Sequence, residues 1–190
     1  MQVDYALLKQ RLDSTVRELR SGHKTPDRAR KVELRHTANL ESEVSNGEFA
    51  FRVDAAKDAG GTGAYARPMD YVLGGLLSCQ HMWCLRWAAL KGKAFGELTI
   101  EAVGRFTWRG KYLEEVDAGL IAIDVSYRIQ ASDLARADLI DLADTVAKRC
   151  PVFATLRRAV PLNEEIFLNG SMESRRVWKP GANAAETFQK

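Results

Sequence analysis

The sequence predicts an α+β fold in which antiparallel strands cover one long central helix. The predicted strands and helices are grouped along the chain rather than strictly alternating, which argues against a parallel sheet. The longest apolar segment, residues 69–91, is apolar nearly all round, as expected of a helix that is buried on most sides. This segment is long enough for a membrane span, but Gln80, His81 and Arg86 favour a buried core helix, because polar and charged groups are costly in lipid.

The other elements are predicted from periodicity and end signals. Apolar residues at helical spacing predict a helix over residues 4–21, which Ser21-Gly22 ends. Asn46-Gly47, two residues that tolerate positive φ, joins predicted strands at 32–43 and 48–54. We further expect a loop at 55–67 with a flexible glycine turn, followed by strands at 97–107 and 120–129. A helix is expected at 133–149, capped by Ser132 or Asp133, and a helical turn at 152–157. Short strands are expected near Val160 and at 166–168.

Composition indicates a soluble globular protein. The chain has 190 residues, 46% hydrophobic and 28% charged, which fits one domain with appendages. We expect an N-terminal helical extension (1–31), a main domain (32–170) and a C-terminal tail (171–190). The net charge of +3, without a basic stripe between aromatic residues, argues against a nucleic-acid partner. No basic segment followed by an apolar one begins the chain, so we expect a cytoplasmic protein without membrane attachment.

Two cysteines form a possible redox pair. Cys79 lies inside the long helix, and Cys150 closes a helix directly before Pro151. In a reducing cytoplasm a disulfide between them would be transient and catalytic. The alternative is that both are buried small apolar residues. Cys84 falls on another helix face and is expected to pack in the core, and no metal site is expected, because Cys79, His81 and Cys84 cannot converge from one helix.

Three segments around these cysteines resemble the OsmC/Ohr family of thiol-dependent hydroperoxide reductases. They are Arg67–Leu73 running to Ser78-Cys79, Gly119–Tyr127, and Leu142–Val152 with its Cys-Pro-Val helix end. The resemblance covers about residues 32–168. It implies an OsmC-like, intertwined homodimer in which antiparallel sheets wrap around a pair of central helices. Gly74-Gly75, which cost roughly 1 kcal/mol each inside a helix, fit such a close helix approach.

The resemblance also implies roles for the two thiols. Cys79 would be the peroxidatic cysteine and Cys150 the resolving one, with an external dithiol such as dihydrolipoamide as reductant and no bound cofactor. A free cysteine with a pKa near 8.5 is only about 3% thiolate at pH 7, so a cation is needed beside Cys79.

In the best-known family members that cation is an arginine from an N-terminal strand, held by a glutamate just before the cysteine helix. The candidates here are Arg35, Arg52 and Arg67, and the sequence does not choose among them. Asp70 occupies the acidic position and is expected to orient the cation. The residue directly after Pro68 is a methionine, where some members carry the acid.

The sequence therefore predicts an antioxidant peroxidase that reduces organic hydroperoxides through a Cys79 sulfenic acid and a Cys79–Cys150 disulfide. Two alternatives stay open: a non-catalytic dimer of the same fold that binds an apolar ligand, and a redox sensor that uses the same disulfide. Trp83 and Trp87 lie one turn apart on the cysteine helix. They pack in the core or line an apolar pocket beside the thiol, and such a pocket would favour organic hydroperoxides over hydrogen peroxide.

Overall fold

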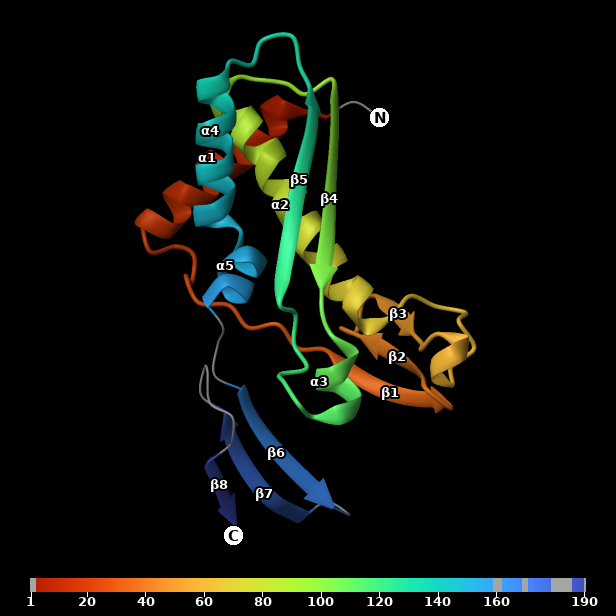
Figure 1. Cartoon of the computed structure of the whole chain (residues 1–190). Helices are drawn as coiled ribbons and strands as arrows, with labels where there is room; N and C mark the ends of the chain where they lie inside the picture. The colour runs from red at the N-terminus through yellow and green to blue at the C-terminus, as the bar shows by residue number, and fades with distance from the viewer. Residues whose placement is uncertain (1–2, 159–161, 169–170, 179–185, 190) are drawn as a thin grey trace.

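One long helix, α2 (Pro68–Lys91), organises the protein. The structure is a computed structural model and describes residues 3–158, 162–168, 171–178 and 186–189. Packed on α2 are α1 (Tyr5–Arg20), α4 (Arg136–Arg149), α5 (Pro151–Arg158) and the antiparallel hairpin of β4 (Glu97–Arg105) and β5 (Ala122–Gln130) (Figure 1). The mixed α+β class with antiparallel strands is confirmed.

The ends of α2 follow from its sequence. Pro68 is the first helical residue, where its missing N–H costs nothing, and the Asp70 carboxylate accepts a hydrogen bond from the Arg67 N–H at 2.9 Å. Gly92, at φ 65°, ends the helix in the left-handed conformation that glycine adopts without strain. The predicted boundaries are therefore confirmed to within one residue at the N-terminal end.

One side of α2 is open to solvent, so the prediction of burial on most sides is wrong for the single chain. Met82 is 47% exposed, whereas Leu76 and Trp87, which lie more than 100° around the helix from it, are buried. A Cβ atom added at Gly74 or Gly75 would meet no heavy atom within 4 Å. The close approach that the glycine pair predicts is therefore not made within the described residues of one chain.

The N-terminal sheet has three antiparallel strands, β1 (Glu33–Ala38), β2 (Glu41–Ser45) and β3 (Ala50–Val53), in that order. The hairpin turn at Asn46-Gly47 is confirmed, with Gly47 at φ 93°. The single strand predicted over residues 32–43 is wrong, because Asn39 takes a φ of 45° and turns the chain back on itself. A short 3-10 helix, η1 (Lys57–Ala59), lies in the following loop.

The remaining connections differ from the prediction in detail. A short helix, α3 (Trp108–Leu113), lies between β4 and β5 and was not predicted. Helix α4 begins at Arg136, three residues later than expected. The carboxylate of Asp138 accepts a hydrogen bond from the Ala135 N–H at 2.9 Å, so the predicted caps, Ser132 and Asp133, are wrong. The predicted helical turn at 152–157 is confirmed as α5.

A third antiparallel sheet, drawn below the rest in Figure 1, contains β6 (Leu162–Leu168), β7 (Ser171–Trp178) and β8 (Glu186–Gln189). The predicted strand at 166–168 lies within β6, and Val160 lies outside the described residues. Strands β7 and β8 occur where the sequence indicates a tail, because pairing between strands gives order to a segment with a weak pattern of its own. The division at residues 31 and 170 stays a prediction.

The buried core lies between α2 and the α4–α5 pair. It contains Cys79, Cys84, Trp87, Ala88, Leu142, Val146 and Cys150. The Trp87 indole N–H donates to the Asp141 carboxylate at 2.7 Å, which joins α2 to α4. Tyr5 of α1 packs against the same core, and its hydroxyl accepts a hydrogen bond from the Phe95 N–H at 3.1 Å. None of the helices in the described ranges combines the length and apolar character needed to cross a bilayer.

The Tyr5 contact tests whether α1 is part of the folded core. Tyr5→Phe removes the acceptor of a half-buried backbone N–H, so we expect a loss of roughly 1 kcal/mol in the free energy of unfolding, measured by urea denaturation. The control is Tyr112→Phe, whose side chain is 54% exposed, with an expected change below about 0.5 kcal/mol. Equal effects of the two substitutions would mean that α1 does not contribute to the cooperative unit.

Candidate active site

The fold brings Cys79 and Cys150 together. Cys79 lies in the middle of α2 and is 8% exposed, whereas Cys150 ends α4 and is fully buried in the same core. Helix α4 stops at this cysteine because the following residue, Pro151, starts α5 in a new direction. The Phe153 N–H donates to the Cys150 Sγ at 3.4 Å, which fixes the thiol at the junction of the two helices.

The environment keeps the Cys150 thiol protonated. Burial raises the pKa of Cys150 to about 11, and a hydrogen bond to Cys79 adds to this effect. A thiol with this pKa stays protonated and is a weak nucleophile at neutral pH. The arrangement suits a pair in which Cys79 reacts first and Cys150 second.

Cys84 packs in the same core, as predicted, and is fully buried. Burial raises the pKa of its thiol to about 12. Burial, with the nearby Cys84 and Cys150, also raises the pKa of Tyr127 to about 12. Across the described ranges of the chain, no group of three or more His, Cys, Asp or Glu side chains is arranged to hold a metal ion.

An apolar groove with a volume of about 510 Å³ lies near the thiol pair, although neither cysteine is among its lining residues. Leu76, three residues before Cys79, and Phe153, three residues after Cys150, both line it. Its other lining residues come from the start of α2, the start of β5 and the end of α5, and are Met69, Val72, Leu120, Ile121, Ala122, Ile123, Val125, Leu156 and Arg157. Trp83 and Trp87 do not line this groove: Trp87 lies in the core and Trp83 packs against it, so the expectation of core packing is confirmed.

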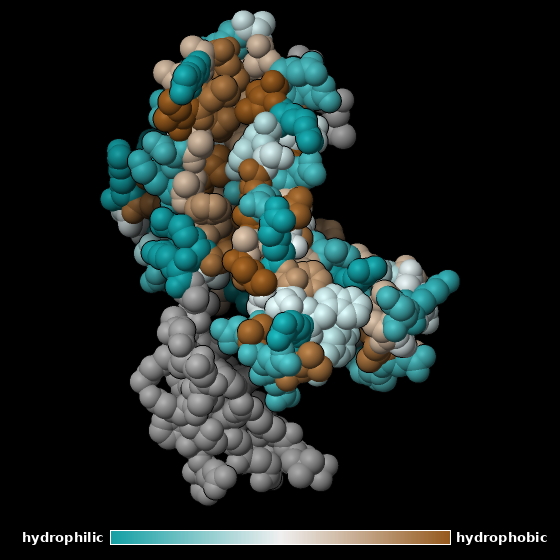
Figure 2. Space-filling view, in the orientation of Figure 1, coloured by the Kyte–Doolittle hydropathy of each residue, from teal (hydrophilic) through white to brown (hydrophobic). Residues whose placement is uncertain are grey.

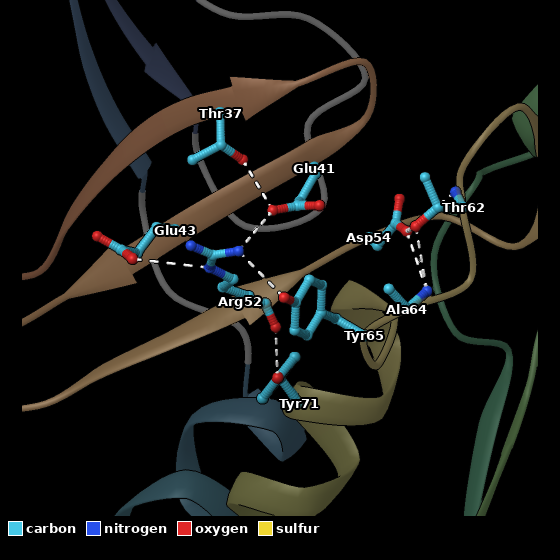
Figure 3. Close-up of polar contacts among 9 residues, drawn as sticks. All are labelled: Thr37, Glu41, Glu43, Arg52, Asp54, Thr62, Ala64, Tyr65 and Tyr71. Carbon is cyan, nitrogen blue, oxygen red and sulfur yellow. Dashed lines mark hydrogen bonds and ion pairs between the residues drawn. The ribbon is translucent and has the colours of Figure 1, made fainter.

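Two of the three candidate arginines, Arg35 and Arg52, have carboxylate partners in this chain. Arg52 forms ion pairs with Glu41 at 3.2 Å and Glu43 at 3.8 Å and donates to the Tyr65 hydroxyl at 3.0 Å (Figure 3). The side chain of Arg35 is 81% exposed and lies 3.6 Å from Glu43. Arg67 flanks the start of α2.

Asp70 lies away from the thiols. Its exposed carboxylate accepts the Arg67 N–H and caps α2, nine residues and therefore about 13.5 Å along the helix axis from Cys79. Its predicted role of orienting a cation beside the thiol stays a prediction. The N-terminal sheet is anchored near Asp70 by the Tyr71 hydroxyl, which donates to the Arg52 carbonyl at 2.6 Å (Figure 3).

The glycine-rich loop before α2 is organised around a buried carboxylate, which the sequence did not indicate. Asp54 is 1% exposed and accepts hydrogen bonds from the Thr62 hydroxyl at 2.6 Å and from the Ala64 N–H at 3.2 Å (Figure 3). The Thr62 hydroxyl, followed by the backbone donors, lowers the pKa of Asp54. An added Cβ at Gly61 would lie 2.1 Å from the Ala55 carbonyl oxygen, so this glycine is required by close approach rather than flexibility.

Sequence reasoning also missed a cationic cluster beside the thiol pair. The guanidinium carbons of Arg86 and Arg149 lie over the Trp83 ring, 5.0 Å and 5.6 Å from its centroid. Trp83 packs against the core that contains Cys79. We call these three side chains the Trp83 cluster. The sequence feature that could have indicated this cluster is Arg149, which directly precedes Cys150.

The raised pKa of Cys84 predicts a pH-dependent stability. The unfolded thiol titrates near pH 8.5 and the folded one near 12, so its stabilising effect is complete below pH 8.5 and is lost as pH rises toward 12. We expect the free energy of unfolding of the wild type, in a thiol reductant, to fall more steeply between pH 8.5 and 10.5 than that of Cys84→Ala. The extra slope should approach about 1.4 kcal/mol per pH unit. Parallel slopes would show that Cys84 is not buried as described.

Comparisons with known proteins agree with this fold. A family model described as "OsmC-like protein" matches residues 61–165, more than half of the chain. An OsmC-like protein from Mycoplasma pneumoniae is 20% identical, with a TM-score of 0.61, over 70% of this chain and 90% of its own. A Legionella pneumophila structure described as an organic hydroperoxide resistance protein OsmC is 13% identical, with a TM-score of 0.52, over 70% and 92%. Comparison with curated protein sequences gives no match. The chain belongs to the OsmC-like protein family.

Proposed function

We propose that this protein is a thiol-dependent peroxidase that reduces organic hydroperoxides, with Cys79 as the nucleophile and Cys150 as the resolving cysteine. The observation that carries the proposal is that these two thiols lie in one buried core, near an apolar groove lined by Leu76 and Phe153. The small exposed fraction of Cys79 gives a reagent access to it, whereas Cys150 and Cys84 are fully buried. The hydroperoxide resistance named for the Legionella pneumophila relative is consistent with this chemistry.

The reaction follows from the two sulfurs. The Cys79 thiolate attacks the terminal oxygen of the hydroperoxide and the O–O bond breaks. The alkoxide takes up a proton and leaves as the alcohol, and Cys79 becomes a sulfenic acid. The Cys150 thiol then condenses with it, an S–S bond forms and water is released. The hydroperoxide has gained two electrons from the cysteine pair, and an external dithiol returns them by two thiol–disulfide exchanges.

The groove supports an organic rather than an inorganic peroxide. Its walls are almost entirely aliphatic and aromatic side chains, which bind the alkyl or aryl part of a substrate by apolar burial. Hydrogen peroxide has no such part and gains nothing from the groove. The activating cation and the orienting role of Asp70 belong to this proposal as expectations carried over from the family.

Thiol counting after a single turnover tests both cysteine roles. We expect reduced wild type to lose two thiols per chain on anaerobic addition of cumene hydroperoxide, since one sulfur is oxidised and the second closes the disulfide. Cys79→Ser should lose none, and Cys150→Ser should accumulate a sulfenic acid. Cys84→Ala, the matched control, should behave as the wild type. Retention of all thiols over minutes in the wild type would contradict the peroxidase proposal.

The second candidate is a dimer of this fold that binds an apolar ligand without turnover. Two observations favour it: the groove itself, and the carboxylate partners that hold Arg35 and Arg52 in this chain. The rate of Cys79 alkylation by iodoacetamide against pH separates the two. A thiol titrating below about pH 6.5 favours the enzyme, and one at 8.5 or above favours the binder. A redox sensor would use the same disulfide, with the basic N-terminal helix as its output.

We also propose that the protein works as a homodimer. Apolar side chains reach the surface of the body and of the N-terminal sheet in Figure 2, and a single soluble chain rarely leaves so many uncovered. Among them are Leu34, Phe49, Phe51, Val72, Val103, Phe106, Trp108, Leu113 and Ile121. The open Gly74-Gly75 surface of α2 supports an approach by α2 of a second copy.

A bulky side chain at this surface tests the dimer. In an isolated chain Gly75→Leu should stabilise α2 by up to about 1 kcal/mol, because leucine is a better helix former and nothing lies within 4 Å of the added Cβ. In a dimer packed at this surface it should clash and raise the dissociation constant at least 10-fold by sedimentation equilibrium. Ala143→Leu, on the exposed surface of α4, is the control. A stabilised variant with unchanged association would contradict helix packing at Gly75.

A further inference from the structure

We propose that the Trp83 cluster, Arg86, Trp83 and Arg149, is a binding site for a carboxylate on the molecule that reacts at the Cys79–Cys150 pair. This inference rests on the proposed thiol chemistry and adds a class of reactant to it: an apolar molecule with a negatively charged end. Two sources share this chemistry, an anionic hydroperoxide and an anionic dithiol reductant.

The position of the cluster follows from helix geometry. On α2 the residues Met69, Val72, Leu76, Cys79, Trp83 and Arg86 are separated alternately by three and four positions, so they form one continuous row along the helix. The first three line the groove, and the last two belong to the cluster. Helical side chains lean toward the N-terminus, so the Trp83 ring lies over the turn that carries Cys79.

The α4–α5 segment repeats this order on the facing side. Arg149 carries the second guanidinium, Cys150 the second thiol, and Phe153 the start of the groove wall. The groove, the thiol pair and the cationic cluster therefore follow one another along α2 and also along the α4–α5 segment. The cluster begins one helical turn from Cys79 and ends two turns from it, about 5–11 Å along the axis. That spacing suits a reactant whose carboxylate is joined to its reacting group by a short chain.

Charge also indicates an anion. Within residues 3–158, no carboxylate lies within 4.0 Å of Arg86 or Arg149, in contrast to Arg52, Arg105, Arg109 and Arg128. Their guanidinium carbons are at most 10.6 Å apart, because one is 5.0 Å and the other 5.6 Å from the same ring centroid. One indole therefore holds two positive charges for which residues 3–158 supply no carboxylate partner, and a bound carboxylate would supply one.

The chemistry of arginine makes these side chains suitable ligands. A guanidinium stacked on an aromatic ring keeps its N–H donors around its edge, where they can form paired hydrogen bonds with a carboxylate. Stacking also fixes the side chain in advance, so less conformational entropy is lost on binding. Arg149 is exposed and Arg86 half-buried, so the cluster is reachable from solvent.

Binding is tested first with unreactive probes. Octanoate and octanamide differ only in the charged group, and their affinity for the reduced protein is measured by calorimetry. We expect octanoate to bind the wild type at least 10-fold more tightly than octanamide. The double variant Arg86→Gln/Arg149→Gln should lose this preference, and Arg136→Gln, which removes an exposed arginine at the other end of α4, should keep it. Equal binding of both probes by the wild type would overturn the proposal, whatever the peroxidase result.

Kinetics then identify the source of the carboxylate. Linoleic acid hydroperoxide is compared with its methyl ester as oxidant, and dihydrolipoate with dihydrolipoamide as reductant. The double variant should slow the charged member of at least one pair about 10- to 100-fold and leave the neutral member within twofold. An effect on the first pair assigns the site to the substrate, and one on the second to the reductant.

Other kinetic outcomes separate this inference from the proposed function. If the double variant slows charged and neutral members equally, the carboxylate site is refuted while the peroxidase stands. If the wild type consumes no hydroperoxide at all, the proposed function fails, and the octanoate preference alone decides the inference.

Discussion

The packing of the α4–α5 junction against the middle of α2 is the constraint on which the rest of the structure depends. It encloses the core, and it places Cys150 against Cys79, residues from distant parts of the chain. Pro151 sets the position of the junction, because it ends one helix and begins the next at the residue that carries the thiol. The same burial that stabilises the core raises the pKa of Cys150, so packing and chemistry have one cause.

Much of this arrangement could be predicted from local sequence signals. The long apolar segment with Pro68 at its start and Gly92 after its end gave helix α2 almost to the residue, and Asn46-Gly47 gave the β2–β3 turn. These features are decided by neighbouring residues. The cysteine pairing was different, because the sequence indicated only a possible redox pair and the family resemblance was needed to give each thiol a role. The structure supports the contact of their thiols, and their redox roles are still proposals.

The errors have physical explanations as well. The turn at Asn39 was missed because an asparagine in the left-handed conformation has no glycine beside it to mark the turn. Asp54 was missed because its hydrogen-bond donors come from residues up to ten positions away, across a loop whose glycines indicate only conformational freedom. The Trp83 cluster brings together two helices, and no periodicity within one segment can indicate that meeting.

The cation that would activate Cys79 stays a proposal, as does the homodimer that the exposed apolar surfaces support. The central claim does not depend on a second copy, since both thiols come from one chain. Peptide mapping by mass spectrometry after one equivalent of cumene hydroperoxide, without reductant, tests it most directly. A disulfide joining the Cys79 and Cys150 peptides of the same chain, with Cys84 still a free thiol, is the expected result. A disulfide that includes Cys84, or one that links two chains, would contradict the proposed pair.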